Sequence, residues 1–136
     1  MDLWVQALPP TPGRTLISAW FVLHEFSHGR PERVVEFFRR LHRHCPQADV
    51  VVGEIVSVPD LALAADRANS IMPEFLLFHA LSGQGVLTWE QHCYVLAEIP
   101  YKLIAEEHFD SVLVSGADPI PSSFIWHLRP GGVRNG

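Results

Sequence analysis

The sequence predicts an α/β domain in which helices cover both faces of a sheet. Residues 16–23 form a nearly unbroken apolar run, and residues 49–58 form a second run that is rich in β-branched side chains. A run that is apolar on both faces predicts an inner strand rather than an edge strand with one wet side. Residues 31–45, between the two runs, have helical spacing. Strand, helix and strand in this order predict two parallel strands joined by a right-handed crossover.

The helix predicted between these strands begins at Pro31, which suits the first turn of a helix, and ends before Pro46. Its apolar residues fall at helical spacing on one face, and four arginines take the other face. The apolar face consists of Val34, Phe37, Phe38, Leu41 and Cys45. We therefore expect an amphipathic helix whose basic face is solvated.

The chain after the second strand predicts three more helices. Pro73 divides a helical pattern into helices over residues 61–71 and 74–81. The second of these is apolar nearly all round, so we expect it to be buried. Thr88 and Gln91 then form a capping box, which opens the third helix.

Two strands complete the predicted sheet, over residues 101–109 and 122–129. The last strand alternates, which predicts that Phe124 and Trp126 share one face. Before the first strand, prolines at three of the positions 9–12 exclude a helix or an inner strand.

The chain of 136 residues has the length of one domain and is long enough to bury a core. We expect the domain to span residues 16–130, after a proline-rich N-terminal arm of residues 1–15 and before a flexible tail of residues 131–136. The composition, 48% hydrophobic and 18% charged, is typical of a soluble globular protein.

The net charge of −5 argues against a nucleic-acid partner, because such proteins usually carry a basic face. No apolar run approaches the roughly 20 residues that a membrane span needs. The first residues have no basic start followed by a long apolar segment, so we see no secretory signal. Cys45 and Cys93 are too few for a disulfide scaffold and are expected to be buried free thiols in a reducing cytoplasm.

Polar residues at the predicted strand ends are candidates for a functional site. His24 and Glu25 follow the first apolar run directly, and open α/β sheets bind ligands beyond the carboxyl ends of their strands. Glu54 lies inside the second run, where a carboxylate is either paired or near the exposed strand end. His79 lies on the apolar helix and His127 in the last strand. The alternative is that these histidines are unrelated, each hydrogen-bonded in its own part of the structure.

The sequence resembles the C-terminal half of class I methyltransferases that use S-adenosylmethionine. The similarity rests on the segments LISAWFVLHEFSHG, RVVEFFRRLHRHCPQADVVVGEIV and FLLFHALSGQG, and it covers nearly the whole chain. It implies a Rossmann-like partial sheet, with residues that face the substrate at the tip of the first strand and an acid such as Glu54 in the next. The segments VVGEIV, SIMPEFLLFHALSGQG and YKLIAEEHFD look most like C-methyltransferases that act on α-keto acids such as 2-ketoarginine.

The resemblance implies that His24, Glu25 and His79 act in catalysis on a small-molecule substrate. For an α-keto acid the nucleophile is an enol carbon, so enolate charge must be stabilised, and a divalent or ferric ion would do this. His79 and His127 are the candidate metal ligands. The histidines show no local metal-binding signature, so no metal site can be read from their spacing.

The chain departs from this family in its donor site. The family binds S-adenosylmethionine through a glycine-rich turn after its first strand and an acid at the end of its second, and this sequence shows neither. Three possibilities remain: a methyltransferase fragment that is inactive alone, one subunit of a split enzyme, or a non-catalytic binding or oligomerisation domain. We expect the chain alone not to bind S-adenosylmethionine.

The absence of the donor-binding half also leads us to expect that the chain associates with another chain. Without the preceding strands, the strand of residues 16–23 becomes an exposed sheet edge, and exposed apolar edges tend to pair or aggregate. We therefore expect a homo-oligomer or a partner chain that supplies the donor-binding half.

Overall fold

The computed structural model describes residues 14–58, 72–112 and 120–131. Four strands form one mixed sheet in the order β1-β2-β4-β3. They are β1 (Leu16–Trp20), β2 (Asp49–Ile55), β3 (Tyr101–Val112) and β4 (Ile120–Pro130). The first two strands are parallel, and β4 runs antiparallel to both β2 and β3. The expected α/β fold and the parallel pair of strands are confirmed.

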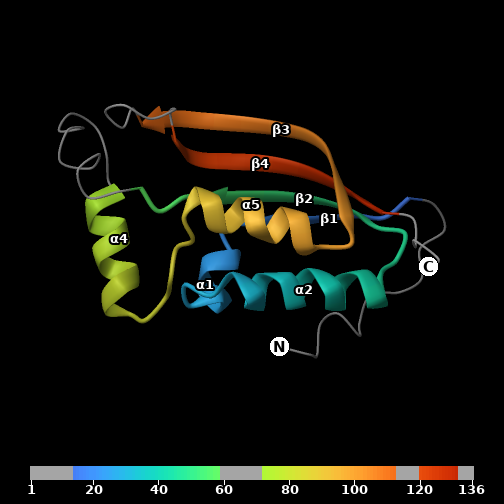
Figure 1. Ribbon diagram of the computed structural model, residues 1–136, viewed down its shortest axis with the longest axis horizontal. Helices are drawn as coiled ribbons and strands as arrows, with labels where there is room; N and C mark the ends of the chain where they lie inside the picture. Colours follow the sequence, from blue (N-terminus) through green and yellow to red (C-terminus); the bar gives the residue numbers. More distant parts are fainter. Residues whose placement is uncertain (1–13, 59–71, 113–119, 132–136) are drawn as a thin grey trace.

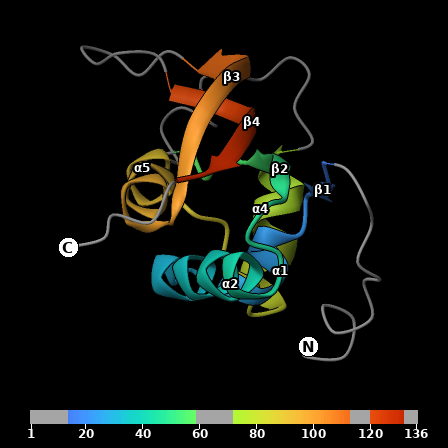
Figure 2. The same ribbon diagram turned by 90° about the vertical axis from the view of Figure 1, so that its right-hand side faces the viewer.

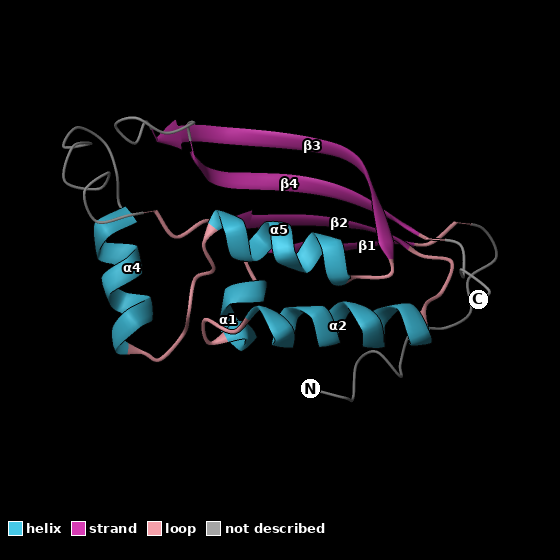
Figure 3. Cartoon of the chain, viewed as in Figure 1, coloured by secondary structure: helices cyan, strands magenta, loops and turns pink. Residues whose placement is uncertain are grey.

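Four helices are described: α1 (Leu23–Ser27), α2 (Pro31–His44), α4 (Met72–Leu81) and α5 (Trp89–Glu98). In two perpendicular views, α2 and α5 lie side by side under one face of the sheet (Figures 1 and 2). Figure 3 shows the same layering by secondary structure, with the sheet above and these helices below. Coverage of the second face therefore stays a prediction. No helix in the described ranges is long and apolar enough to cross a membrane.

The core lies between the sheet and these two helices. Alternate residues of β4 point into it, so Phe124, Trp126 and Leu128 are all almost fully buried, as the alternation predicts. The helix α2 contributes Val34, Val35, Phe38 and Leu41, and α5 contributes Val95. Burial of these side chains supplies the main driving force for folding.

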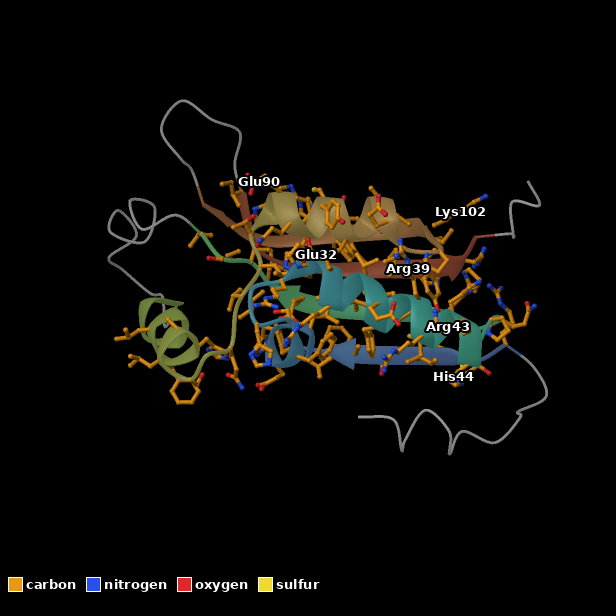
Figure 4. All side chains as sticks on the ribbon, turned by 60° about the horizontal axis from the view of Figure 1, so that its bottom comes forward. Glu32, Arg39, Arg43, His44, Glu90 and Lys102 are labelled. Atoms are coloured by element: carbon orange, nitrogen blue, oxygen red, sulfur yellow. The ribbon has the colours of Figure 1, made fainter. Side chains whose placement is uncertain are left out.

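The local signals for α2 and α5 predict both helices well. Pro31 is at the start of α2 and the helix ends before Pro46, while Thr88 and Gln91 form the expected capping box at α5. The arginines of α2 are exposed, and they form surface ion pairs such as Arg39 with Glu98. Figure 4 shows the labelled Arg39 and Arg43 along this basic side, with Lys102 at the same end of the molecule.

The prediction of a long inner strand over residues 16–23 is wrong. The strand ends at Trp20 because Phe21 takes a left-handed φ of 49° and Leu23 begins a helix. Among the described residues β1 is an edge strand, and both Leu16 and Trp20 are half exposed or more on the side away from the helices. In the described part of the chain, the exposed edge that the resemblance predicts is present over Leu16–Trp20.

The prediction that the helix of residues 74–81 is buried is also wrong. Figure 1 shows α4 at one end of the molecule, apart from the sheet face that α2 and α5 cover. Leu77 and Phe78 are 60% and 63% exposed, and Leu81 is 80% exposed. The apolar composition of a helix predicts burial only where another surface is available to cover it.

The remaining predictions differ in smaller ways. The sequence predicts a strand over residues 49–58, but β2 ends at Ile55, and only a single bridge from Ser57 to Thr88 follows it. β3 extends to Val112 rather than residue 109. Cys45 and Cys93 are free thiols, but neither is fully buried as predicted: Cys45 is half-buried and Cys93 is exposed. The predicted helix 61–71, residues 1–13 of the arm and residues 132–136 of the tail lie outside the described residues.

Candidate active site

The candidate site lies beyond the carboxyl ends of the parallel strands β1 and β2. Two residues separate β1 from the short helix α1, which carries His24 and Glu25. Glu54 stands one residue before the end of the neighbouring strand β2. The turn between β1 and α1 therefore folds over the end of β2, and this brings side chains 30 residues apart in sequence into contact.

Glu54 is a buried carboxylate held by three hydrogen bonds. It accepts from the backbone N–H of Leu23 at 2.7 Å, from Nδ1 of His24 at 2.8 Å and from its neighbour Ile55 at 2.9 Å. A carboxylate only accepts in such bonds, so Nδ1 of His24 carries a hydrogen. The side chain of Glu54 thus fixes both the tautomer and the orientation of the imidazole.

The second ring nitrogen of His24 faces Glu25. Its Nε2 lies 3.5 Å from Oε1 of Glu25, whose side chain is half exposed. The other carboxylate oxygen of Glu25 accepts a hydrogen bond from the amide of Gln84. A polar chain therefore runs from the loop after α4 through Glu25 and His24 to the buried Glu54.

His79 joins this group from α4. Its ring meets that of His24 edge to face, with 4.7 Å between the centroids and 78° between the planes. It is 5% exposed, whereas Leu77 and Phe78 beside it are mostly exposed. The possible ligand atoms of His24, Glu25 and His79 lie within 4.8 Å of one another. The structure thus brings together the three residues for which the sequence predicts a catalytic role.

The environment of His24 favours its protonated form. Burial lowers the pKa of the imidazole, but the hydrogen bond and charge of Glu54, together with the charge of Glu25, outweigh burial and raise the pKa above 6.5. A base of this kind takes up a proton readily, and Glu54 stabilises the resulting imidazolium.

The loop after α4 is attached to α1 and to the residue that follows it, through side-chain hydrogen bonds to the loop's backbone carbonyls and through close backbone packing. The hydroxyl of Ser27 donates to the carbonyl of Gly85 at 2.5 Å, and Nδ1 of His28 lies 2.7 Å from the carbonyl oxygen of Gly83. Gly85 packs so closely on Gly29 that a Cβ there would lie 1.9 Å from the Gly29 nitrogen. These contacts fix the loop, and with it the C-terminal end of α4, against the helix that carries His24.

His127 lies away from this group. Its Nε2 is 3.0 Å from Oδ2 of Asp49, at the start of β2, whereas Glu54 is at the other end of the same strand. The pKa of Asp49 is lowered: burial opposes the shift, but hydrogen bonds from Arg129 and His127 outweigh it. The structure therefore does not bring His127 next to His79, and it gives His127 a hydrogen-bond partner of its own in Asp49.

The sequence does not predict that two further polar residues, Gln84 and His92, lie near the site. Gln84 is one more polar residue in a glycine-rich loop, and its contact with Glu25 crosses 59 positions. His92 is almost fully buried on α5 against Phe124, and burial lowers its pKa to about 4 although the charge of Glu54 opposes this. Glu54 itself has a signal, because an acid inside an apolar strand must be paired.

Comparison with known proteins supports the fold. No protein-family model matches the sequence, and no curated protein matches it. The structure of the mitomycin 7-O-methyltransferase MmcR matches with a TM-score of 0.51 and 18% identity, over 94% of this chain and 32% of that one. LaPhzM matches with a TM-score of 0.49 and 17% identity, over 90% of this chain and 31% of that one.

The chain thus spans about a third of the length of these two solved proteins. At such low identity the match with MmcR concerns the fold alone. Within that limit it identifies the architecture, because an α/β sheet of mixed strands with helices recurs in the C-terminal part of a methyltransferase. The chain has a methyltransferase-like fold, and it corresponds to the C-terminal part of that fold.

Proposed function

We propose that this chain forms the substrate side of a small-molecule methyltransferase that uses S-adenosylmethionine, with His24 as the general base. The observation that carries the proposal is the position of His24 at the carboxyl end of the sheet, with Nδ1 held by the buried Glu54 and Nε2 beside Glu25. Open α/β sheets in general bind ligands at this edge, which supports the proposal. Both the residues and the fold therefore support the same chemistry.

The chain's residues would act on the methyl acceptor. An acceptor hydroxyl or enol loses its proton to Nε2 of His24 as its oxygen or carbon bonds to the methyl group. Glu54 stabilises the imidazolium through Nδ1, and the raised pKa of His24 suits it to take this proton. S-adenosylmethionine, when bound, would supply the methyl group, and its demethylated product would be a neutral thioether. His79 limits the space beside the ring of His24.

The donor site of the proposed enzyme would come from outside the described residues. The turn between β1 and α1 contains Phe21 and Val22 rather than the glycines of a donor loop. Another part of a longer chain or a second protein would supply that site next to β1. We therefore expect titration calorimetry on the 136 residues alone to show no micromolar binding of S-adenosylmethionine.

A second candidate, an alternative to His24 as the base, is a metal ion for acceptors of the α-keto acid kind, because Nε2 of His24 cannot take up a proton and bind a metal at once. The donor set fits, because two imidazoles and a carboxylate from His24, Glu25 and His79 converge within 4.8 Å. Such ligands suit a divalent transition metal, which when bound supplies Lewis acidity toward a keto acid. Since His127 is paired with Asp49, the metal proposal moves from His79 and His127 to this group.

The role of His24 as the base is tested in the isolated protein, together with any partner chains that copurify with it. Transfer of a labelled methyl group is measured for the native protein and for His24→Ala, with candidate phenols and α-keto acids as acceptors. We expect His24→Ala to reduce turnover at least 100-fold, the lower range of general-base effects, without loss of folding. Replacement of the exposed His44 is the control and should change little. Full activity in His24→Ala would refute the assignment of His24 as the general base.

The metal is tested without turnover. Zn²⁺ is titrated into the chain by calorimetry, and the same titration is made with His79→Ala and His127→Ala. Loss of binding in His79→Ala with retention in His127→Ala supports the group of His24, Glu25 and His79. Equal binding in all three proteins contradicts it.

A further inference from the structure

A second group of charged side chains lies at the opposite end of β2 from Glu54. Asp49 begins this strand, and its Oδ2 accepts hydrogen bonds from Nη2 of Arg14 at 2.9 Å and from Nη2 of Arg129 at 3.3 Å. Nε2 of His127 lies 3.0 Å from the same oxygen. One carboxylate oxygen therefore holds two guanidinium groups and an imidazole that come from opposite ends of the chain.

The strand register places this group on the outer face of the sheet. Val50 pairs with Leu128, and both side chains are buried in the core that α2 and α5 cover. Because successive residues of a strand point to opposite faces, Asp49 and Arg129 point to the other face. Lys102 of β3 is the register partner of Arg129 and shares that face. The two helices lie below the sheet, away from this group (Figures 1 and 2).

The group carries more positive than negative charge. Arg14, Arg129 and Lys102 are three cations, and Asp49 is the carboxylate with which the described structure pairs the two arginines. Each guanidinium has five N–H donors, and Asp49 uses only some of them. The side chains of Arg14 and Arg129 are 70% and 43% exposed, whereas that of Asp49 is 11% exposed. Asp49 thus holds like charges close together and leaves donors free to meet an anion.

We propose that Arg14, Arg129 and Lys102 bind the phosphate group of a small soluble phosphate monoester. Such a group carries nearly two negative charges at neutral pH, which matches the excess of positive charge. Planar guanidinium groups bind phosphate oxygens through two parallel N–H donors, and a lysine adds a point charge. Because Asp49 already orients both guanidinium groups, the anion need not order them itself. This site is separate from the candidate active site, and it does not depend on the proposed function.

The test is calorimetric titration of the full chain with inorganic phosphate and with glycerol phosphate at low salt. We expect both to bind, and we expect Arg14→Gln and Lys102→Gln each to weaken binding roughly tenfold, the effect of one hydrogen bond to a charged group. Both side chains are exposed, so these variants should fold. Arg129→Lys keeps the charge but loses the planar donors, and it should also bind more weakly.

Arg43→Gln is the matched control. Arg43 lies at the same end of the molecule as Lys102 but on α2 (Figure 4). This variant removes one positive charge from the other side of the sheet and should bind both phosphates like the native chain. Equal weakening in Arg43→Gln would show a general attraction to anions and overturn the site. The proposal is also overturned if the folded native chain binds neither phosphate, or if it binds only vesicles that contain phosphatidic acid.

Discussion

The imidazole of His24 lies between two carboxylates in different surroundings. Glu54 is almost fully buried and bonds to Nδ1 at 2.8 Å, whereas Glu25 is half exposed and lies 3.5 Å from Nε2. Charge interactions are stronger where water is excluded, so Glu54 has the larger effect on His24. Glu54 therefore sets the tautomer and much of the basicity, and Glu25 adjusts the side that meets a substrate.

The pair of His24 and Glu54 predicts a specific dependence of stability on pH. Because the pKa of His24 is raised in the folded state, its stabilising contribution is complete below the unfolded value of 6.5 and is lost as pH rises through the folded pKa. Glu54→Gln should lower the unfolding free energy by about 1–3 kcal/mol at pH 6, and this deficit should shrink toward pH 9. Urea unfolding at pH 6 and at pH 9 measures the loss of unfolding free energy and its change with pH.

The control for this prediction is Glu36→Gln on the exposed side of α2. Hydrogen bonds from Arg40 and Arg43 lower the pKa of Glu36, so its contribution is complete throughout the same pH range. Its effect should therefore be small and constant from pH 6 to 9. A deficit in Glu54→Gln that does not change with pH would argue against a charged imidazole in the pair.

At the residue scale, the sequence predicts those site residues that stand out from their surroundings. His24 and Glu25 end an apolar run, and His79 interrupts an apolar helix, so all three are visible as exceptions. Gln84 is not visible, because a glutamine in a polar loop breaks no pattern. His127 is a polar residue at an alternating position of β4, and only the register shows that it faces the Asp49 end of β2.

The helix α5 shows how a local signal predicts an element. The side chain of Thr88 accepts from the backbone of Gln91, and the side chain of Gln91 accepts from the backbone of Thr88. Thr88→Ala removes one of these bonds and should lower the unfolding free energy by about 1 kcal/mol. Thr88→Ser, which keeps the hydroxyl, should lose much less. If the two variants unfold at the same urea concentration, the cap does not stabilise the domain.

Elements whose boundaries depend on distant residues are predicted less well. Caps and prolines define α2 and α5 within the local sequence, so both helices are found. The apolar run at residues 16–23 contains no comparable stop, and its strand ends because the chain turns at Phe21 to place His24 over Glu54. The helix α4 is misjudged for the related reason that burial depends on a covering surface, which composition does not reveal.

At the scale of the whole molecule, both sheet edges, β1 and β3, and one sheet face lack described neighbours. In the described part of the chain β1 pairs only with β2, and Leu16 and Trp20 expose apolar surface on the side away from α2. The chain spans about a third of the length of MmcR, whose fold it shares in part. These features predict that the isolated chain associates through β1, either with another copy or with a chain that supplies the donor site.

The hydrogen bonds of β1 indicate how such pairing can be blocked selectively. The carbonyl of Thr15 accepts from Asp49, and the N–H of Phe21 donates to Gly53, so the odd-numbered residues of β1 face β2. In a parallel ladder the bonding direction alternates, and the N–H of Ser18 therefore points toward the free edge. A proline at position 18 removes a donor from that edge without removing one from the pairing with β2.

Ser18→Pro should therefore reduce self-association of the isolated chain and leave its folding intact. Sedimentation velocity over a range of concentrations should show larger species for the native chain and a monomer for Ser18→Pro, with similar thermal melts for both. Ser18→Thr, which keeps the N–H and favours a strand, should associate like the native chain. A native chain that is monomeric at every concentration and unfolds in one sharp transition would contradict the open edge, because a half-covered sheet with an unpaired apolar edge should not remain alone in solution.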